Sequence, residues 1–311
     1  MKFEHISVLL NECIEGLAIK PTGTYVDGTL GGAGHASVVC AQLLSEGHFI
    51  GIDQDKNALA VSKERLKLVK PKVSLVRSNF EKVTQVFDDL NVDKIDGMLI
   101  DLGVSSHQLD EPSRGFSYMH DAPLDMRMDQ EAAYTAYDIV NEMDEEGLFH
   151  IIKEYGEENW ARRIAQFIAS ERKIKPIETT YELVEIIKKA IPKGARKDGP
   201  HPAKRTFQAI RIAVNRELEI IEPTINAVVE RLKPGGRLCI ITFHSLEDRI
   251  VKHAFKKLED PCTCLKSLPM CICGKVPTVK VITRKPILPT EEEIEMNPRS
   301  RSAKLRIVEK L

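Results

Sequence analysis

The spacing of short apolar runs in the first hundred residues most constrains what this chain can fold into. Four runs that are rich in β-branched side chains alternate with helical patterns at 35–44 and 56–68. The four runs cover residues 24–27, 48–53, 73–77 and 95–101. Because this alternation is typical of βαβ units, the sequence predicts an α/β fold with a buried parallel sheet.

The last third of the chain predicts how this sheet is completed. A Lys-Pro-Gly-Gly turn within 232–237 is expected to end a helix before a strand at 238–242. Two further strands, at 279–283 and 303–308, would then close the sheet.

The stretch 106–215 interrupts the alternation, because helix and loop patterns replace the strands there. A chain of 311 residues is long enough for two domains. We therefore expect a core formed by 1–105 and 216–311, and an inserted, mainly helical substrate-recognition domain at 106–215.

Composition excludes several classes of protein. With 42% hydrophobic and 29% charged residues, the chain can bury a sizeable core, which argues against disorder. No apolar run approaches the length of a membrane span, and the N-terminal run is too short for a secretory signal. Seven cysteines in such a chain indicate reduced thiols, so we expect a cytoplasmic protein.

A glycine-rich stretch at 25–35 predicts a cofactor site, since it follows a strand and opens a helix. Glycines there let the backbone approach a ligand at the helix N-terminus. Asp53 ends the next strand, 19 residues after Gly34. This is close to the interval of about 20 residues at which a carboxylate accepts hydrogen bonds from a ribose.

Two cofactor classes fit this spacing, NAD and S-adenosylmethionine. The glycines do not follow the GxGxxG order, and Asp27 would repel a pyrophosphate but suits the ammonium of a methionine moiety. Asn79 and Phe80 could form a wall for adenine, and Asp101 would add a carboxylate at the same sheet edge. These features favour S-adenosylmethionine.

Eight motifs in one order resemble the MraW family of bacterial ribosomal RNA small-subunit methyltransferases. They extend over nearly the whole chain, at residues 5–10, 27–35, 101–110, 114–117, 123–128, 201–208, 243–249 and 297–302. The resemblance implies a class I S-adenosylmethionine methyltransferase fold, Rossmann-like with a mostly parallel seven-stranded sheet. It also implies methyl transfer to the exocyclic N4 of a cytidine in 16S rRNA, at the decoding centre near the P site.

The resemblance further implies partners and cofactor contacts. The partner is 16S rRNA within the 30S subunit, with no membrane, and we keep a homodimer among the expectations. The implied cofactor contacts are Ala33, Gly34, His35, Asp53, Phe80, Asp101 and Gln108. One departure is Ser7, where the family is expected to have proline, and it affects only the entry of the first segment.

Methyl transfer to a cytosine amine requires an acceptor for its N–H and a fixed geometry, because the amine is a weak nucleophile. Similar amino-methyltransferases carry an Asp/Asn/Ser-Pro-Pro-aromatic string after the fourth strand, but residues 101–105 read Asp-Leu-Gly-Val-Ser. We hypothesise that Asp101, or the backbone after it, accepts the proton. Phe116 or Tyr118 would stack on the base.

Asp125 and His244 are two further catalytic candidates. Asp125 and Arg127 can share one face of an extended segment, but a structural ion pair is the favoured interpretation of these two residues. His244 ends the fifth strand and could meet the substrate. However, Ser245 with Asp248 resembles a capping box, whose role is only to start a helix.

A basic stretch at 188–216 predicts the RNA-binding face, with nine Lys or Arg residues against one acidic residue. Lys204, Gln208 and Arg211 recur at helical spacing and could follow RNA phosphates. A solvated helix face is the alternative interpretation.

Two CxC motifs lie close together, one formed by Cys262 and Cys264 and the other by Cys271 and Cys273. Structural zinc prefers cysteines spaced by two or more residues, so we assign no metal site from the sequence. A zinc knuckle, reduced cysteines and a reversible disulfide all stay open.

Three other functions compete with RNA methylation. The first is a methyltransferase that acts on DNA or on a small-molecule amine. The second is an NAD-type oxidoreductase, and the third is a cofactor-sensing RNA-binding protein without catalysis.

Overall fold

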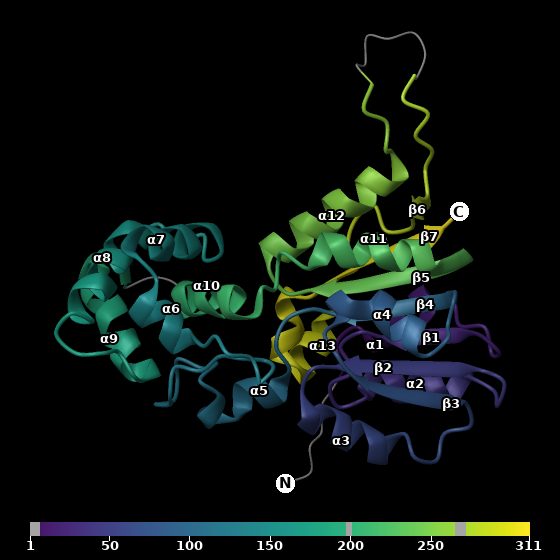
Figure 1. Cartoon of the computed structure of the whole chain (residues 1–311), viewed down its shortest axis with the longest axis horizontal. Coiled ribbons are helices and arrows are strands. Elements are labelled where there is room, and N and C mark those ends of the chain that lie inside the picture. Colours follow the sequence, from purple (N-terminus) through teal and green to yellow (C-terminus); the bar gives the residue numbers. More distant parts are fainter. Residues whose placement is uncertain (1–6, 197–200, 265–271) are drawn as a thin grey trace. The chain divides into compact units, whose positions relative to one another are not determined.

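The computed structural model describes residues 7–196, 201–264 and 272–311 (Figure 1). The chain divides into two compact units, which we describe separately. The core unit comprises Met1–Gly103 and Leu218–Leu311, and the inserted unit comprises Val104–Glu217. Among the described residues, no helix combines the length and apolar character needed to cross a membrane.

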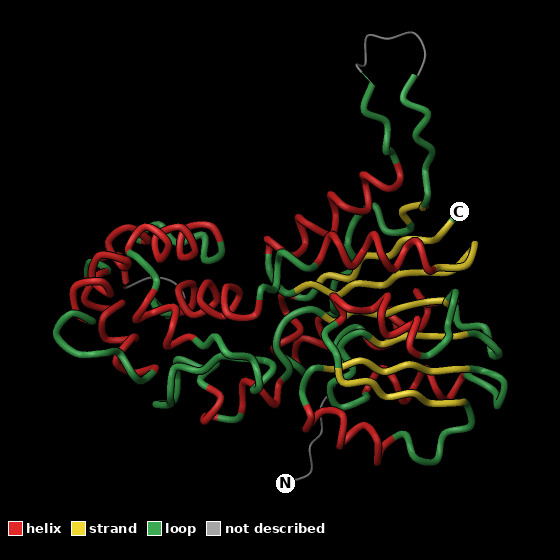
Figure 2. Tube along the Cα trace, viewed as in Figure 1, coloured by secondary structure: helices red, strands yellow, loops and turns green. Residues whose placement is uncertain are grey.

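A seven-stranded sheet in the order β3-β2-β1-β4-β5-β7-β6 forms the centre of the core unit (Figure 2). Its strands are β1 Thr24–Asp27, β2 His48–Asp53, β3 Lys72–Arg77, β4 Ile95–Asp101, β5 Leu232–Thr242, β6 Val279–Val281 and β7 Lys304–Lys310. The first five pair in parallel, and β7 pairs antiparallel with both β5 and β6. The expected mostly parallel sheet is therefore confirmed.

Alternate residues of each strand feed two hydrophobic clusters on opposite faces of the sheet, as the period of two requires. Val26 and Ile100 belong to one cluster, whereas Tyr25 and Leu99 belong to the other. The first face is covered by α4 Val83–Asp89, α11 Ile221–Arg231 and α12 Ser245–Glu259. The second is covered by α1 Leu10–Leu17 and α2 Gly34–Gln42, with α3 Lys56–Arg65 at its margin.

The start of β5 corrects the expected boundary. Helix α11 ends at Arg231, but the Pro-Gly-Gly turn lies inside β5 rather than before it. Ile95 pairs with Leu232 and Gly97 with Arg237, so the turn is accommodated as a bulge against β4. A local turn pattern could not reveal this, because the pairing partner lies far away in the sequence.

The first segment of the chain is held by its last elements. Helix α1 contacts β5 and β7, and the backbone N–H of Leu9 donates to Glu293 Oε1 at 2.8 Å. Glu293 belongs to α13 Glu291–Met296, which η4 Pro298–Ser302 follows. The N-terminal segment is therefore fixed by residues almost three hundred positions later.

The inserted unit is mainly helical and has its own hydrophobic core. Its helices are α5 Ser106–Asp110, α6 Ala136–Glu142, α7 Glu145–Glu154, α8 Ala161–Glu171, α9 Thr180–Ala190 and α10 Lys204–Asn215, with the short turns η2 Pro112–Arg114 and η3 Lys193–Arg196. Capping boxes at Thr135 and Thr179 start α6 and α9. Leu148, Ile164 and Ile210 are fully buried among these helices.

Candidate active site

The carboxyl ends of β1, β2 and β4 place three acidic side chains at one edge of the sheet. β1 lies between β2 and β4, so the strand order reverses beside it. Ligands of open α/β sheets bind at such a switch point, outside the carboxyl ends of the strands. Asp27, Asp53 and Asp101 end these strands, and we call them the carboxylate edge.

The glycine-rich loop that follows β1, residues 28–33, is fastened to β2. The backbone N–H of Leu30 donates to Ile52 O at 3.0 Å, and that of Gly31 donates to Asp53 Oδ2 at 2.8 Å. Gly31 and Ala33 both have positive φ, at 49° and 58°. The left-handed turns bring the chain back to start α2 directly after Ala33, its N-cap.

Gly34 allows the first segment of the chain to lie against the start of α2. A Cβ at this position would come within 1.9 Å of Ser7 Oγ, so a larger residue would force the Ser7 hydroxyl to turn away. The buried His35 ring lies with Nε2 2.9 Å from Val8 O. Ser7 is thus accommodated by the absence of a side chain at Gly34. The His35 side chain holds the segment that contains Ser7 and Val8.

Asp27 is nearly fully buried and is supported by the loop. Its Oδ1 accepts hydrogen bonds from the Thr29 N–H at 3.0 Å and from the Thr29 hydroxyl at 3.5 Å. Burial, with a smaller contribution from the charge of Asp53, raises the pKa of Asp27 to about 7, although the bonds from Thr29 oppose this. Burial also raises the pKa of Asp53.

Asp101 has the least satisfied carboxylate of the three. Burial raises its pKa well above the ordinary value, and the charges of Asp27 and Glu247 add to this. Within the described part of the chain, its Oδ1 is buried and has no hydrogen-bond partner. Such an atom is costly unless a ligand or water satisfies it, so it marks a binding position.

Thr29 connects Asp27, at the end of β1, with Asp101, at the end of β4. The sequence analysis did not identify Thr29 as a site residue. Its Oγ1 accepts the Asp101 N–H at 2.6 Å while it lies next to Asp27 Oδ1. The available signal was a hydroxyl two residues after a buried aspartate, which is typical of an Asx-turn. Its bond to Asp101 could not be inferred, because 72 residues separate the two.

Phe80 and Asn79 lie where an adenine wall was expected, at the end of β3. Phe80 is partly exposed, and its remaining surface packs on the cluster that contains Val83. Asn79 caps η1 Phe80–Lys82 by accepting the Glu81 N–H at 2.9 Å. Phe80 thus keeps an apolar surface available for a ligand, and Asn79 fixes the turn that positions it.

His244 is the N-cap of α12, which corrects the expected cap at Ser245. Its Nδ1 accepts the Glu247 N–H at 3.4 Å, while Glu247 Oε2 accepts the N–H groups of Phe243 and His244. His244 Nε2 lies 3.1 Å from Glu247 Oε1, but the two atoms are not aligned as a hydrogen bond. The sequence analysis missed the fully buried Glu247.

The inserted unit holds the remaining site candidates, and each makes contacts within that unit. Gln108 Oε1 accepts the Ser105 N–H at 3.0 Å, so the side chain caps α5. Asp125 forms a two-pronged ion pair with Arg127, with Oδ2 2.6 Å from Nη2. Although burial opposes it, Arg127 holds the pKa of Asp125 below its ordinary value. This geometry favours the structural interpretation of Asp125.

Lys204, Gln208 and Arg211 form a polar stripe on α10, and two of these three residues bind other parts of the inserted unit. Arg211 binds Glu217 through two bonds of 2.9 and 2.8 Å, and Gln208 Nε2 donates to Tyr155 O at 3.1 Å. Lys204, at the start of the helix, is exposed. Lys204 is therefore the stripe residue best placed to meet a phosphate, and the sequence could not separate it from Arg211.

Of the two expected stacking residues, only Tyr118 keeps accessible surface. Phe116 is 6% exposed and packs in the core of the inserted unit, which leaves no ring face for a base. Tyr118 is partly buried and stacks on His201, with ring centroids 4.6 Å apart. Tyr118 therefore remains the stacking candidate.

The buried Asp27 leads to a prediction about stability and pH. Its pKa is about 7 in the folded chain against 3.8 ordinarily, so the folded state binds a proton more tightly between these values. Stability should then fall as pH rises from about 4 to 7, by up to about 1.4 kcal/mol per pH unit. Thermal melts of Asp27→Asn should show a flatter pH profile than wild type in this window, and parallel profiles would contradict the assignment.

The sheet order, the glycine-rich loop after β1 and the acid at the end of β2 together define the α/β class of S-adenosylmethionine-dependent methyltransferases. The sequence profile of the MraW methylase family matches residues 2–311. The chain belongs to this family.

Individual relatives agree with this membership over the full length. The chain is 63% identical to the ribosomal RNA small subunit methyltransferase H of Clostridioides difficile and 55% identical to that of Ruminiclostridium cellulolyticum, with 100% of each chain covered. Among solved structures, an rRNA methylase from Streptococcus thermophilus is similar at 12% identity with a TM-score of 0.44, over 99% of both chains, and this likeness does not bear on the membership.

Proposed function

We propose that this protein transfers a methyl group from S-adenosylmethionine to the exocyclic N4 of a cytidine in 16S rRNA, at the decoding centre of the 30S subunit. The observation that carries the proposal is full-length identity of 55–63% to two proteins named ribosomal RNA small subunit methyltransferase H. The family resemblance of the motifs supports the N4 position and the P-site location. A ribosomal substrate also implies work in the cytoplasm.

The residues of the core unit fit S-adenosylmethionine. The glycine-rich loop, which Asp53 Oδ2 holds at the Gly31 N–H, starts α2 beside the carboxylate edge, and Asp27 of that edge is nearly fully buried. Asp53 would accept the ribose hydroxyls, Phe80 would cover the adenine and Asp27 would face the ammonium. When bound, the cofactor supplies an electrophilic methyl group.

Asp101 is the best acceptor for the proton of the target amine. Its oxygen Oδ1 needs a donor, and an amine N–H is one. Its raised pKa makes it a stronger base than an ordinary carboxylate, which favours transfer of the amine proton to it. A hydrogen bond from N4 to Oδ1 would orient the amine and take its proton as the new bond forms.

His244 is a second candidate for contact with the substrate, and its geometry favours a positioning role. Its backbone N–H and Nδ1 are both used in the cap of α12. Glu247, which accepts two backbone N–H groups, also contributes to the raised pKa of Asp101. We infer that the cap stabilises the chain after β5 and tunes Asp101.

The inserted unit is the part of the chain that we assign to RNA recognition. Lys204 and Arg205 are exposed in the first turn of α10, within the basic stretch 188–216. Tyr118 offers an aromatic ring that His201 already holds in one orientation. Exposed cations and a fixed aromatic ring are the groups that bind phosphates and unstacked bases.

Replacing Lys204 by Gln should lower affinity for 30S subunits and flatten its salt dependence. If Lys204 neutralises one phosphate, the log-log salt slope should fall by about 0.7–0.9. The measurement is a salt titration of binding. Lys153→Gln removes the same exposed charge from α7 of this unit and should leave the slope unchanged. Equal slopes for all three proteins would show that Lys204 is only a solvated residue.

Arg211→Gln separates phosphate binding from folding. Because Arg211 pairs with the buried Glu217, we expect this variant to melt at lower temperature than wild type. Lys204→Gln should melt like wild type, since an exposed substitution changes stability by about 0.5 kcal/mol or less.

The proposed reaction is tested by methyl transfer from labelled S-adenosylmethionine to 30S subunits that lack the modification, followed by nucleoside analysis. We expect label in N4-methylcytidine. Naked 16S rRNA, DNA and small amines are the comparison substrates, since a DNA or small-molecule methyltransferase is the main alternative. Label in DNA but not in 30S subunits would overturn the proposal. The homodimer stays a prediction, to be tested by the mass of the protein in solution.

A further inference from the structure

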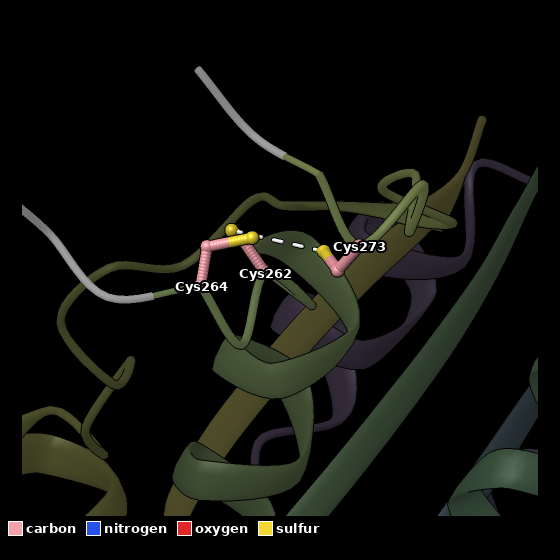
Figure 3. A group of neighbouring side chains, drawn as sticks. All are labelled: Cys262, Cys264 and Cys273. Atoms are coloured by element: carbon pink, nitrogen blue, oxygen red, sulfur yellow. Dashed lines mark hydrogen bonds between the residues drawn. The ribbon is translucent and has the colours of Figure 1, made fainter. Parts of the chain in front are cut away.

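Three cysteines of the segment between α12 and β6 converge on one another (Figure 3). Cys262 and Cys264 follow α12, and Cys273 lies on the returning part of the chain before β6. Their sulfur atoms all lie within 4.8 Å of one another. In addition, the Ile272 N–H donates to Cys264 Sγ at 3.3 Å, a contact that stabilises negative charge on sulfur.

The separation of the sulfur atoms distinguishes between bonding modes. Cys262 Sγ and Cys273 Sγ are 3.9 Å apart, whereas the sulfur atoms of a disulfide are about 2.05 Å apart. Two thiolates on a tetrahedral zinc ion, each at about 2.3 Å from the metal, lie about 3.8 Å apart. The observed separation excludes a disulfide and matches two thiolates on one zinc ion, although two thiols in hydrogen-bond contact have the same separation.

We propose that Cys262, Cys264 and Cys273 bind a zinc ion through their thiolates. The sequence analysis assigned no metal here because CxC spacing disfavours a local site. The folded chain removes this objection, because the three ligands do not form a local motif. Cys262 and Cys264 follow α12, whereas Cys273 lies on the part of the chain that leads to β6. Cys271 lies outside the described residues.

The other described cysteines are poor metal ligands, which sets this cluster apart. Cys13, Cys40 and Cys239 are buried in the hydrophobic cluster of the core unit. Burial raises the pKa values of Cys40 and Cys239 to about 12, so they stay protonated thiols. By contrast, Cys262 is exposed, and Cys264 and Cys273 are half-buried, so an ion can reach them.

The bound ion would cross-link the residues that follow α12 to the residues that lead back to β6. Each thiol loses its proton when it coordinates zinc, so three protons are released as three Zn–S bonds form. No oxidant is needed, and the site is compatible with a reducing compartment. The site would hold the residues that follow α12 against those that precede β6.

The test is the metal content of the purified, reduced, full-length protein, measured by elemental mass spectrometry after dialysis. We expect about one zinc ion per chain in wild type and a tenfold or greater loss in Cys262→Ser, Cys264→Ser and Cys273→Ser. Thr263→Ser, between two of the ligands, and Cys40→Ala, a thiol outside the cluster, should retain the ion. Thermal melts show whether each variant is folded.

A second measurement needs no variant. Wild-type protein loaded with Co²⁺ should show the sulfur-to-cobalt charge-transfer absorption of thiolate coordination. Absence of stoichiometric zinc from protein produced with added zinc would overturn the proposal. So would full zinc content in folded Cys262→Ser and Cys273→Ser, or a disulfide between these two cysteines in protein alkylated at lysis.

Discussion

Replacing Asp101 by Asn should reduce kcat about 10²–10⁴-fold while the protein stays folded and binds its cofactor with similar affinity. The size of the loss is that of removing a general base. Asn has nearly the same shape, so packing at the end of β4 is preserved. The measurement is single-turnover methyl transfer to 30S subunits, with cofactor binding followed by calorimetry.

The stability of the same variant provides an internal control. Asp101 Oδ1 is buried, it has no hydrogen-bond partner in the described structure, and it is repelled by Asp27 and Glu247. A neutral amide relieves this repulsion, so Asp101→Asn should melt at or above the wild-type temperature. A normal rate in the folded variant would remove the carboxylate from the mechanism and leave the backbone after it as the acceptor.

Replacing Asp53 by Ala should weaken cofactor binding about 10²–10⁴-fold and leave affinity for 30S subunits nearly unchanged. Two ribose hydroxyl bonds to a charged acceptor are lost, each worth about 1.5–3 kcal/mol. The Gly31 N–H also loses its acceptor, which loosens the glycine-rich loop. Calorimetry with S-adenosylmethionine measures the change directly.

One further substitution at Asp53 and one at Asp55 separate the effect of the Asp53 charge from the effect of its hydrogen bond to the Gly31 N–H. Asp53→Asn keeps an oxygen for the Gly31 N–H but removes the charge, so its affinity should lie between wild type and Asp53→Ala. Asp55→Asn changes the next acid while it preserves a good N-cap for α3, and its cofactor affinity should equal that of wild type. Unchanged affinity in folded Asp53→Ala would remove the ribose role from this strand end.

The sheet and the carboxylate edge could be predicted because their signals are local. β1, β2 and β4 are short apolar runs that each end in an aspartate, so the sequence marks both the strand and the residue at its end. The start of β5 could not be predicted, since its bulge depends on pairing with β4.

Side-chain roles that depend on distant partners were beyond sequence reasoning. Thr29 resembles any loop hydroxyl until β4 brings the Asp101 N–H to it. Arg211 and Lys204 look alike in a basic stretch, and only the folded α10 shows that Arg211 pairs with Glu217. The cysteine cluster likewise depends on the return of the chain to Cys262.

Because the Leu9 N–H donates to Glu293, the segment that packs beside the cofactor loop can dock fully only after residue 293 has been synthesised. Ser7, against which Gly34 packs, is synthesised long before α13 and β7. Contacts of such long sequence separation close late in folding. A nascent chain therefore carries the segment around Ser7 and Leu9 undocked until the residues of α13 have been synthesised, so the start of α2 gains its packing partner late.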